Sequence, residues 1–303
     1  MAINRRDFFK LAAAGTTTLA VGSAAADDIP PTDCSEYYGV LVDTVVCIGC
    51  RKCELACDQE HTKSGRRPES FDDKSVFDRH RRPDKDAFTV LNRFEDPDNP
   101  SKKYTMKVQC MHCNEPACVS ACIVGALRKT STGPVVYDAW KCIGCRYCMV
   151  ACPFQIPAYE YDNALDPRVR KCTFCFERIT EDHELPACVA ICPNEALTFG
   201  TRQQLLDIAH YRIKSNPGVY VDHVYGETEA GGTSWLYLAP VDFKHTELPV
   251  LKADVIPSLT ETIQHGIFKS FLPPIALYGL LGLVMHATRE RDAAPSDAEV
   301  PHE

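Results

Sequence analysis

Four cysteines with a fixed spacing are the strongest chemical signal in the sequence. Between residues 142 and 153 the chain reads C-x2-C-x2-C-x3-C-P, with the cysteines Cys142, Cys145, Cys148 and Cys152. A cubane iron–sulfur cluster needs four thiolates around a compact core, and three cysteines on one tight loop can wrap it. Gly144 permits the turn of that loop and lets its N–H groups point at the sulfurs. The run therefore predicts a 4Fe–4S site.

Three other runs repeat this spacing, and two of them have a wider second gap. Their members are Cys47, Cys50, Cys53 and Cys57 in the first run, Cys110, Cys113, Cys118 and Cys122 in the second, and Cys172, Cys175, Cys188 and Cys192 in the fourth. Sixteen of the seventeen cysteines are thereby used. Four complete sets of ligands predict four 4Fe–4S clusters. Cys34 belongs to no run and is expected to be a free or buried thiol.

The last cysteine of a run is expected to serve a neighbouring run. Cys152 lies one helical turn beyond Cys148 and faces away from the loop that wraps the first cluster. In two-cluster ferredoxins this fourth cysteine ligates the other cluster. Each run therefore implies a partner run.

Zinc and disulfides are the alternative interpretations of so many cysteines. Zinc sites use paired C-x2-C knuckles, and such a site needs neither the third cysteine of each run nor the final C-P. Disulfides suit an exported chain, but cysteines two or three residues apart do not pair readily with one another. The spacing favours iron–sulfur clusters, and an exported structural zinc or disulfide protein is the alternative from a different functional class.

Short strands are expected to lead the chain into and out of the cysteine loops. Residues 39–43 enter the first run and residues 134–138 the third, while residues 125–127 and 195–197 return after the second and fourth. Strand, aspartate, cysteine loop and short helix form one half of a ferredoxin, and this unit repeats. The sequence therefore predicts an α+β fold in which residues 27–200 form two ferredoxin-like lobes, each pinned by a cluster pair.

Further elements are predicted between and after the runs. A hairpin is expected for residues 89–94 and 103–108, across a connection rich in Asp, Asn and Pro. A helix capped by Thr201 and a strand at residues 235–238 are expected next. Both belong to a predicted periplasmic extension over residues 201–265.

Both ends of the chain carry signals for a membrane. Residues 1–26 combine the pair Arg5-Arg6, an apolar stretch and an A-x-A site, which together predict a twin-arginine signal peptide. Residues 270–288 are largely apolar and predict a transmembrane anchor, with a buried core helix as the alternative. Basic residues follow, so residues 289–303 are expected to be a cytoplasmic tail. The body is then predicted to lie on the periplasmic side of the cytoplasmic membrane.

The net charge and the absence of common catalytic motifs limit the functions that this sequence could have. The formal net charge is −8, and each oxidised cubane with its thiolates would add about −2, which argues against nucleic-acid binding. The sequence has no glycine-rich phosphate loop, no Ser/His/Asp set and no dinucleotide fingerprint. His112, between two cysteines of the second run, is expected to have a supporting or surface role. We therefore expect a non-catalytic protein that transfers single electrons along a chain of clusters.

The whole arrangement resembles the four-cluster iron–sulfur subunits of anaerobic respiratory oxidoreductases. Within that superfamily it is most similar to the HybA-type subunits of periplasmic, quinone-linked nickel–iron hydrogenases. The particular markers are C-M-H-C at 110–113, C-x-G-C-R-Y-C-M-V-A-C-P at 142–153, F-G-T-R at 199–202 and Y-G-E-x-E-x-G-G-T at 225–233. Ile123 departs from the family, where proline is common after the second run, and little consequence for ligation is expected.

The resemblance implies a set of partners. The chain would accept electrons from the small subunit of a nickel–iron hydrogenase, whose large subunit would oxidise hydrogen. It would pass them to an integral membrane partner that reduces quinone. The same relay beside a formate dehydrogenase or another molybdenum oxidoreductase is the alternative.

The resemblance also implies which cysteines share a cluster, by pairing the first run with the fourth and the second with the third. The four expected ligand sets are Cys47, Cys50, Cys53 and Cys192; Cys172, Cys175, Cys188 and Cys57; Cys110, Cys113, Cys118 and Cys152; and Cys142, Cys145, Cys148 and Cys122. We refer to them below, in this order, as sets A, B, C and D.

Overall fold

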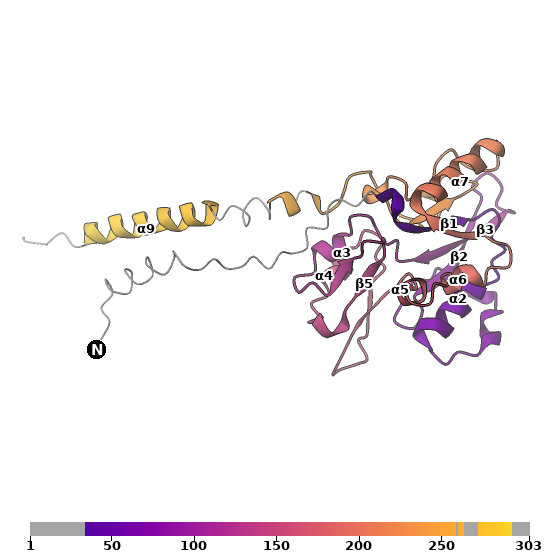
Figure 1. Cartoon of the computed structure of the whole chain (residues 1–303), viewed down its shortest axis with the longest axis horizontal. Coiled ribbons are helices and arrows are strands. Elements are labelled where there is room, and N and C mark those ends of the chain that lie inside the picture. Colours follow the sequence, from indigo (N-terminus) through magenta and orange to yellow (C-terminus); the bar gives the residue numbers. More distant parts are fainter. Residues whose placement is uncertain (1–33, 259, 264–271, 293–303) are drawn as a thin grey trace, which may run out of the picture. The chain divides into compact units, whose positions relative to one another are not determined.

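The computed structural model describes residues 34–258, 260–263 and 272–292 (Figure 1). The chain divides into two units, Met1–Asp33 and Cys34–Glu303, and all four cysteine runs belong to the second unit. The predicted signal peptide, residues 1–26, lies outside the described residues, as do residues 293–303 of the predicted tail. Those two assignments stay predictions.

The second unit mixes short strands with short helices, which confirms the predicted α+β class. The strands are β1 (Tyr38–Asp43), β2 (Thr89–Glu95), β3 (Lys103–Gln109), β4 (Leu127–Lys129), β5 (Val135–Tyr137), β6 (Ala158–Tyr159), β7 (Val169–Arg170), β8 (Leu197–Thr201) and β9 (Trp235–Leu238). The α-helices are α2 (Lys52–Cys57), α3 (Ala117–Ser120), α4 (Tyr147–Ala151), α5 (Phe176–Thr180), α6 (Ala187–Ala190), α7 (Arg202–Ser215) and α9 (Leu272–Asp292). A π-helical turn, η2 (Asp58–Thr62), follows α2 directly. The 3₁₀ turns are η1 (Cys34–Glu36), η3 (Pro68–Phe71), η4 (Ser75–Asp78), η5 (Ala139–Lys141), η6 (Glu229–Gly231) and η7 (Phe243–His245).

The strands pair so that the first run is tied to the fourth and the second to the third. Strand β1, which leads into the first run, is antiparallel to β8, which leaves the fourth. Strand β4 leaves the second run and is antiparallel to β5, which leads into the third. These strands start within two residues of the predicted positions, and β8 extends four residues beyond its predicted end. The pairing brings cysteine loops that are far apart in sequence to neighbouring places.

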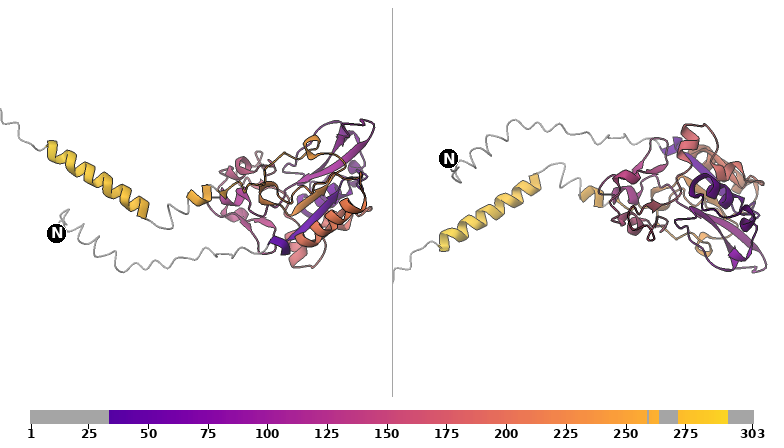
Figure 2. Two further views of the ribbon diagram at one scale, coloured as in Figure 1. Left: turned by 90° about the horizontal axis from the view of Figure 1, so that it is seen from above. Right: turned by 90° about the horizontal axis from the view of Figure 1, so that it is seen from below.

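The segment after residue 201 completes the sheet that contains β1. Strand β9 is parallel to β1, so the sheet order is β8-β1-β9. Helix α7 starts at the predicted cap, Thr201, whose side chain and that of Gln204 form a reciprocal capping box. Its Leu205 packs in one apolar cluster with Leu41 of β1 and Leu236 of β9, and α7 lies beside this sheet (Figure 1, Figure 2). The predicted extension is therefore part of the body's hydrophobic core.

Strands β2 and β3 form the predicted hairpin, with Thr89 opposite Gln109. Residues Val90, Leu91, Met106 and Val108 of the hairpin are buried in the largest apolar cluster, beside cysteines of the runs. A long insertion between the first two runs thus packs against the cysteine loops and supplies part of their support.

The C-terminal helix α9 bears on the predicted transmembrane anchor. It forms over Leu272–Asp292, close to the predicted span at 270–288. In the part of the chain that the structure describes, however, no helix is both long and apolar enough to cross a membrane. Two prolines near the start of α9, His286 within it and the charged residues 289–292 at its end lower its mean hydropathy. The structure therefore does not confirm the predicted transmembrane anchor, which stays a prediction.

Candidate metal centres

Each of the four runs opens with the same backbone turn. The second residue after the first cysteine has a left-handed conformation in every run, with φ of 66° at Gly49, 48° at His112, 70° at Gly144 and 62° at Phe174. This conformation folds the chain back on itself, so that the next cysteine can face the first. A Cβ at Gly144 would lie only 2.6 Å from the hydroxyl of Tyr159, so glycine at this position leaves room for that side chain.

Hydrogen-bond donors lie against the sulfurs of several runs. The contacts are Gly144 N–H to Cys142 Sγ at 3.5 Å, Phe174 N–H to Cys172 Sγ at 3.4 Å, Ala126 N–H to Cys122 Sγ at 3.2 Å and Thr105 Oγ1 to Cys47 Sγ at 3.1 Å. Donors of this kind stabilise a thiolate more than a thiol. The loops are therefore built to hold charged sulfur.

Short helices carry the later cysteines of each run and pack in two pairs. Helix α2, with Cys53 and Cys57, packs against α6, which contains Cys188 (Figure 1). Helix α3 packs against α4, which contains Cys148. The helices thus pair the runs in the same way as the strands do.

Two cavities are lined by complete sets of four cysteines. The first is lined by set A, namely Cys47, Cys50, Cys53 and Cys192. The second is lined by set B, namely Cys57, Cys172, Cys175 and Cys188. In each case three cysteines come from one run and the fourth from the partner run, which is the grouping that the resemblance implies.

The remaining eight cysteines also gather by set. The thiol of Cys113 interacts with those of Cys110, Cys118 and Cys152, which completes set C. The thiol of Cys148 interacts with those of Cys142, Cys122 and Cys145, which completes set D. All sixteen predicted cysteines are therefore placed in four groups of four, while Cys34 lies in η1 and lines neither cavity.

The electrostatics of these groups favour a bound cation. Burial raises the pKa of Cys53, Cys57 and Cys113 well above its ordinary value, and neighbouring sulfurs raise it further. Burial likewise raises the pKa of Cys148 and Cys172 to about 11. Thiols of this kind become thiolates when iron supplies the compensating positive charge. Four sulfurs around one cavity, with donors aimed at sulfur, fit the ligand requirement of a 4Fe–4S cubane. No group of three or more His, Cys, Asp and Glu side chains within the described ranges is placed to hold a single metal ion.

His112 has a supporting place rather than a surface one. It is buried, and its Nδ1 accepts a hydrogen bond of 2.9 Å from the N–H of Val135 in β5. Its ring lies edge-on to Phe174, with centroids 5.0 Å apart. The contacts join the second run to the fourth, through side chains that the cysteine spacing alone did not reveal.

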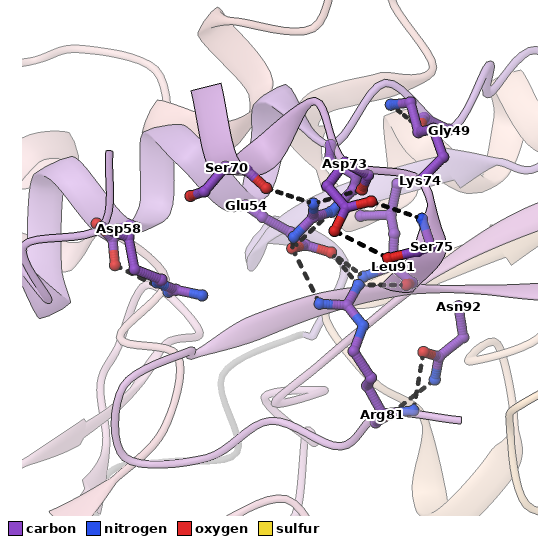
Figure 3. A network of polar contacts seen from close by, with 12 residues as sticks. Gly49, Glu54, Asp58, Ser70, Asp73, Lys74, Ser75, Arg81, Leu91 and Asn92 are labelled. Atoms are coloured by element: carbon purple, nitrogen blue, oxygen red, sulfur yellow. Dashed lines mark hydrogen bonds and ion pairs between the residues drawn. The ribbon is translucent and has the colours of Figure 1, made fainter. Parts of the chain in front are cut away.

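A buried ion-pair network fixes helix α2 in place (Figure 3). Glu54 Oε2 accepts hydrogen bonds from Arg51 at 2.8 and 3.1 Å, and Oε1 accepts 2.6 Å bonds from Arg81 Nη2 and from the N–H of Leu91 in β2. Burial raises the pKa of the Glu54 carboxyl, but the bonds from Arg81, Arg51 and Leu91 outweigh burial and leave the pKa lowered. Since Cys53 and Cys57 flank this residue, the network positions cysteines of both set A and set B.

The Glu54→Gln substitution is expected to destabilise the protein by roughly 3 kcal/mol, because it leaves two arginine charges without their buried partner. The temperature at which visible cluster absorbance is lost, measured anaerobically at pH 7, should fall by several degrees. Because the folded pKa of Glu54 is lowered, its stabilisation is complete above about pH 4.3 and is lost as the pH falls through the folded value. Glu95→Gln, which breaks an exposed pair with Lys103, is the matched control and should change little. Equal losses in both variants would contradict the role of Glu54.

Comparison with known proteins agrees with this geometry. Residues 102–202 match the 4Fe-4S dicluster domain family. A protein of Nitratidesulfovibrio vulgaris is 49% identical over 80% of this chain, which spans 66% of that protein's length. The hydrogenase-2 operon protein HybA of Escherichia coli O157:H7 is 36% identical over 95% of this chain and 96% of its own. The iron–sulfur subunit of the nitrate-inducible formate dehydrogenase of Escherichia coli K12 is 30% identical over 94% of each chain.

These similarities extend over almost the whole sequence and include the region that carries the cysteine runs. They agree with the residue types and with the arrangement of the loops. The chain therefore belongs to the HybA-like family of ferredoxin-type 4Fe–4S subunits, and it is an electron-transfer subunit rather than a catalytic one.

Proposed function

We propose that the sixteen grouped cysteines bind four 4Fe–4S clusters, which supply one-electron transfer when bound. The observation that carries the proposal is the separation of the cysteines into four neighbouring sets, two of which line cavities. Neighbouring sulfurs also connect one set to the next. Cys53 interacts with Cys188, Cys172 with Cys110, and Cys118 with Cys148. The sets thus follow one another in the order A, B, C, D, as a relay requires.

The two ends of this series approach the surface. In set D, Cys145 is exposed, and so are apolar side chains next to the set D cysteines in the sequence, namely Ile123, Trp140, Ile143, Tyr147 and Val150. Near set A, Ile48 is exposed between Cys47 and Cys50. An exposed apolar rim beside a buried redox group suits a docking face, because binding excludes water and shortens the path of the electron. We infer that electrons enter at one end and leave at the other.

The partner is proposed to be a periplasmic nickel–iron hydrogenase. HybA, which covers nearly the whole chain, is named for the hydrogenase-2 operon. In this proposal the small and large hydrogenase subunits deliver electrons from hydrogen, and an integral membrane subunit passes them to quinone. The predicted signal in residues 1–26 would place the complex in the periplasm. The formate dehydrogenase subunit, with 30% identity, supports the alternative partner.

Anaerobic affinity purification of the tagged chain from its own cells tests the partner. We expect nickel to co-purify in a fixed ratio to the chain, and hydrogen gas to reduce the clusters of the complex. Molybdenum in place of nickel, with reduction by formate and not by hydrogen, would overturn the hydrogenase assignment in favour of the alternative. Purification of the chain with neither metal, from cells that contain active hydrogenase, would also contradict it.

A further inference from the structure

One basic side chain reaches both of the cavities that the cysteines enclose. Lys107, in strand β3, lines the cavity of set A and also that of set B. Among the described residues, it is the single residue shared by the two linings. No sequence pattern indicates this role, because β3 lies in the insertion between the first two runs and the Lys107 side chain approaches their cysteines only in the folded chain.

The ammonium group of Lys107 is buried, and it has no acidic partner among the residues that the structure describes. The residue is 3% exposed. Its Nζ donates a hydrogen bond of 3.2 Å to Oε1 of Gln109 and lies 4.4 Å from the ring centroid of Trp235. None of the ion pairs among the described residues includes Lys107. No carboxylate oxygen in that part of the chain therefore lies within 4.0 Å of the Lys107 Nζ. A buried ammonium without a carboxylate is costly unless another negative charge compensates it.

The sulfurs of the two sets are the groups that can supply this negative charge. Lys107 lines the set A cavity together with Cys53 and the set B cavity together with Cys57, Cys172 and Cys188. The same buried ammonium therefore faces both sets.

The lysine is also held in a fixed place. Gln109, which accepts its hydrogen bond, donates through Nε2 to the hydroxyl of Tyr237 at 2.6 Å. That hydroxyl donates in turn to the carbonyl of Lys107 at 2.9 Å. The three residues therefore form a closed, buried ring of hydrogen bonds, and Tyr237 and Gln109 are almost fully buried. A charge held in this way needs no rearrangement when an electron arrives.

We propose that the Lys107 ammonium is a fixed positive charge shared by the clusters of sets A and B, and that it raises the reduction potential of both. The proposal rests on the proposed function, since it requires clusters in these two sets. Reduction adds a negative charge to a cluster, and a nearby cation in a water-poor interior favours the reduced form. Lys107 acts through its positive charge, which tunes the reduction potentials of the two clusters. It would couple two neighbouring clusters of the relay to one group.

Lys107→Met removes this charge and keeps a long unbranched side chain. We expect the ratio of reduced to oxidised cluster at a fixed potential to fall about tenfold or more in sets A and B. A tenfold change corresponds to about 59 mV for one electron. The measurement is an anaerobic titration with dithionite, followed by low-temperature electron paramagnetic resonance. Sets C and D should change much less, because Lys107 lines the cavities of sets A and B. Lys103→Met, at an exposed residue of the same strand, is the matched control and should leave all four potentials unchanged.

Lys107→Arg separates charge from packing. It keeps the positive charge, so the potentials of sets A and B should stay close to those of the unmodified protein. If Lys107→Met loses iron from these sets while Lys107→Arg keeps it, charge compensation is again supported. Loss of iron in both variants, or an unchanged titration in a fully loaded Lys107→Met protein, would overturn the inference. Absence of clusters from the unmodified protein would instead refute the proposed function, so the two failures are distinguishable.

Discussion

Replacing Cys57 with alanine is expected to remove the cluster of set B and to leave that of set A in place. Cys57 lies in the first run, but it lines the cavity formed by the three cysteines of the fourth run. Iron should therefore fall from about sixteen to about twelve atoms per chain. Electron transfer through the relay should be abolished, because set B stands between sets A and C. Iron analysis and electron paramagnetic resonance of the purified variant provide the measurement.

Cys53 provides the sharpest comparison for this variant, because it lies four residues away on the same helix. Cys53 lines the cavity of set A, so Cys53→Ala should give the spectrum of Cys192→Ala. By contrast, Cys57→Ala should give the spectrum of Cys188→Ala. Cys34→Ala, outside all four sets, should keep its full iron content. Identical spectra for Cys53→Ala and Cys57→Ala, each lacking only the set A cluster, would contradict the cross-ligation.

Placing a charge on the rim of set D is expected to weaken docking of the redox partner without disturbing the clusters. Val150 lies on α4 between Cys148 and Cys152 and is 84% exposed. Val150→Glu would bury an unpaired carboxylate in the proposed interface, which should weaken partner binding at least about tenfold. The rate of electron transfer to the partner should fall accordingly at limiting partner concentration. Reaction with a small soluble oxidant should be unaffected, because it needs no docking face.

Tyr211→Glu is the matched control for this experiment. Tyr211 is also an exposed hydrophobic residue, but it lies on α7, which packs on the sheet of β8, β1 and β9. Its substitution should leave both reactions unchanged. Equal effects of Val150→Glu and Tyr211→Glu, or full partner binding by Val150→Glu, would show that the rim of set D is not the docking face.

The four cysteine runs, and the strands that lead into and out of them, could be predicted from the sequence alone, because both depend on local spacing. A C-x2-C-x2-C loop fixes which sulfurs can meet within a run, and the strand before it is visible as a short apolar stretch ending in aspartate. The capped helix after Thr201 was predicted for the same reason, since its capping box involves residues only three apart. Which run partners which was implied only by the family resemblance. In the structure, the strand pairs β1 with β8 and β4 with β5 connect the same runs.

The supporting side chains could not be predicted, because their partners are distant in sequence. Glu54 meets Arg81 and the N–H of Leu91 only after the insertion folds back on α2. Lys107 reaches two cavities whose cysteines range from residue 47 to residue 192. The left-handed Phe174 is also unexpected, since an aromatic residue gives no local signal for that conformation. No pattern within a single segment contains these contacts.

The predicted membrane anchor is a separate case, because it depends on the hydropathy of one helix. Residues 270–288 contain the apolar stretch Phe271 to Met285, which is on the short side of the ~20 residues that usually span a bilayer. Helix α9 includes most of that stretch, with prolines at one end and charged residues at the other. These residues lower the mean hydropathy of the helix, and the described part of the structure does not confirm the anchor.

The most direct test of the account is the cluster content of the anaerobically purified, unmodified chain. Iron, acid-labile sulfide and zinc should be measured together, with an electron paramagnetic resonance spectrum after reduction by dithionite. Four clusters predict about sixteen iron atoms and about sixteen sulfides per chain, with signals broadened by interaction between neighbouring clusters. Zinc without labile sulfide, in a colourless protein, would contradict the relay and with it the proposed function.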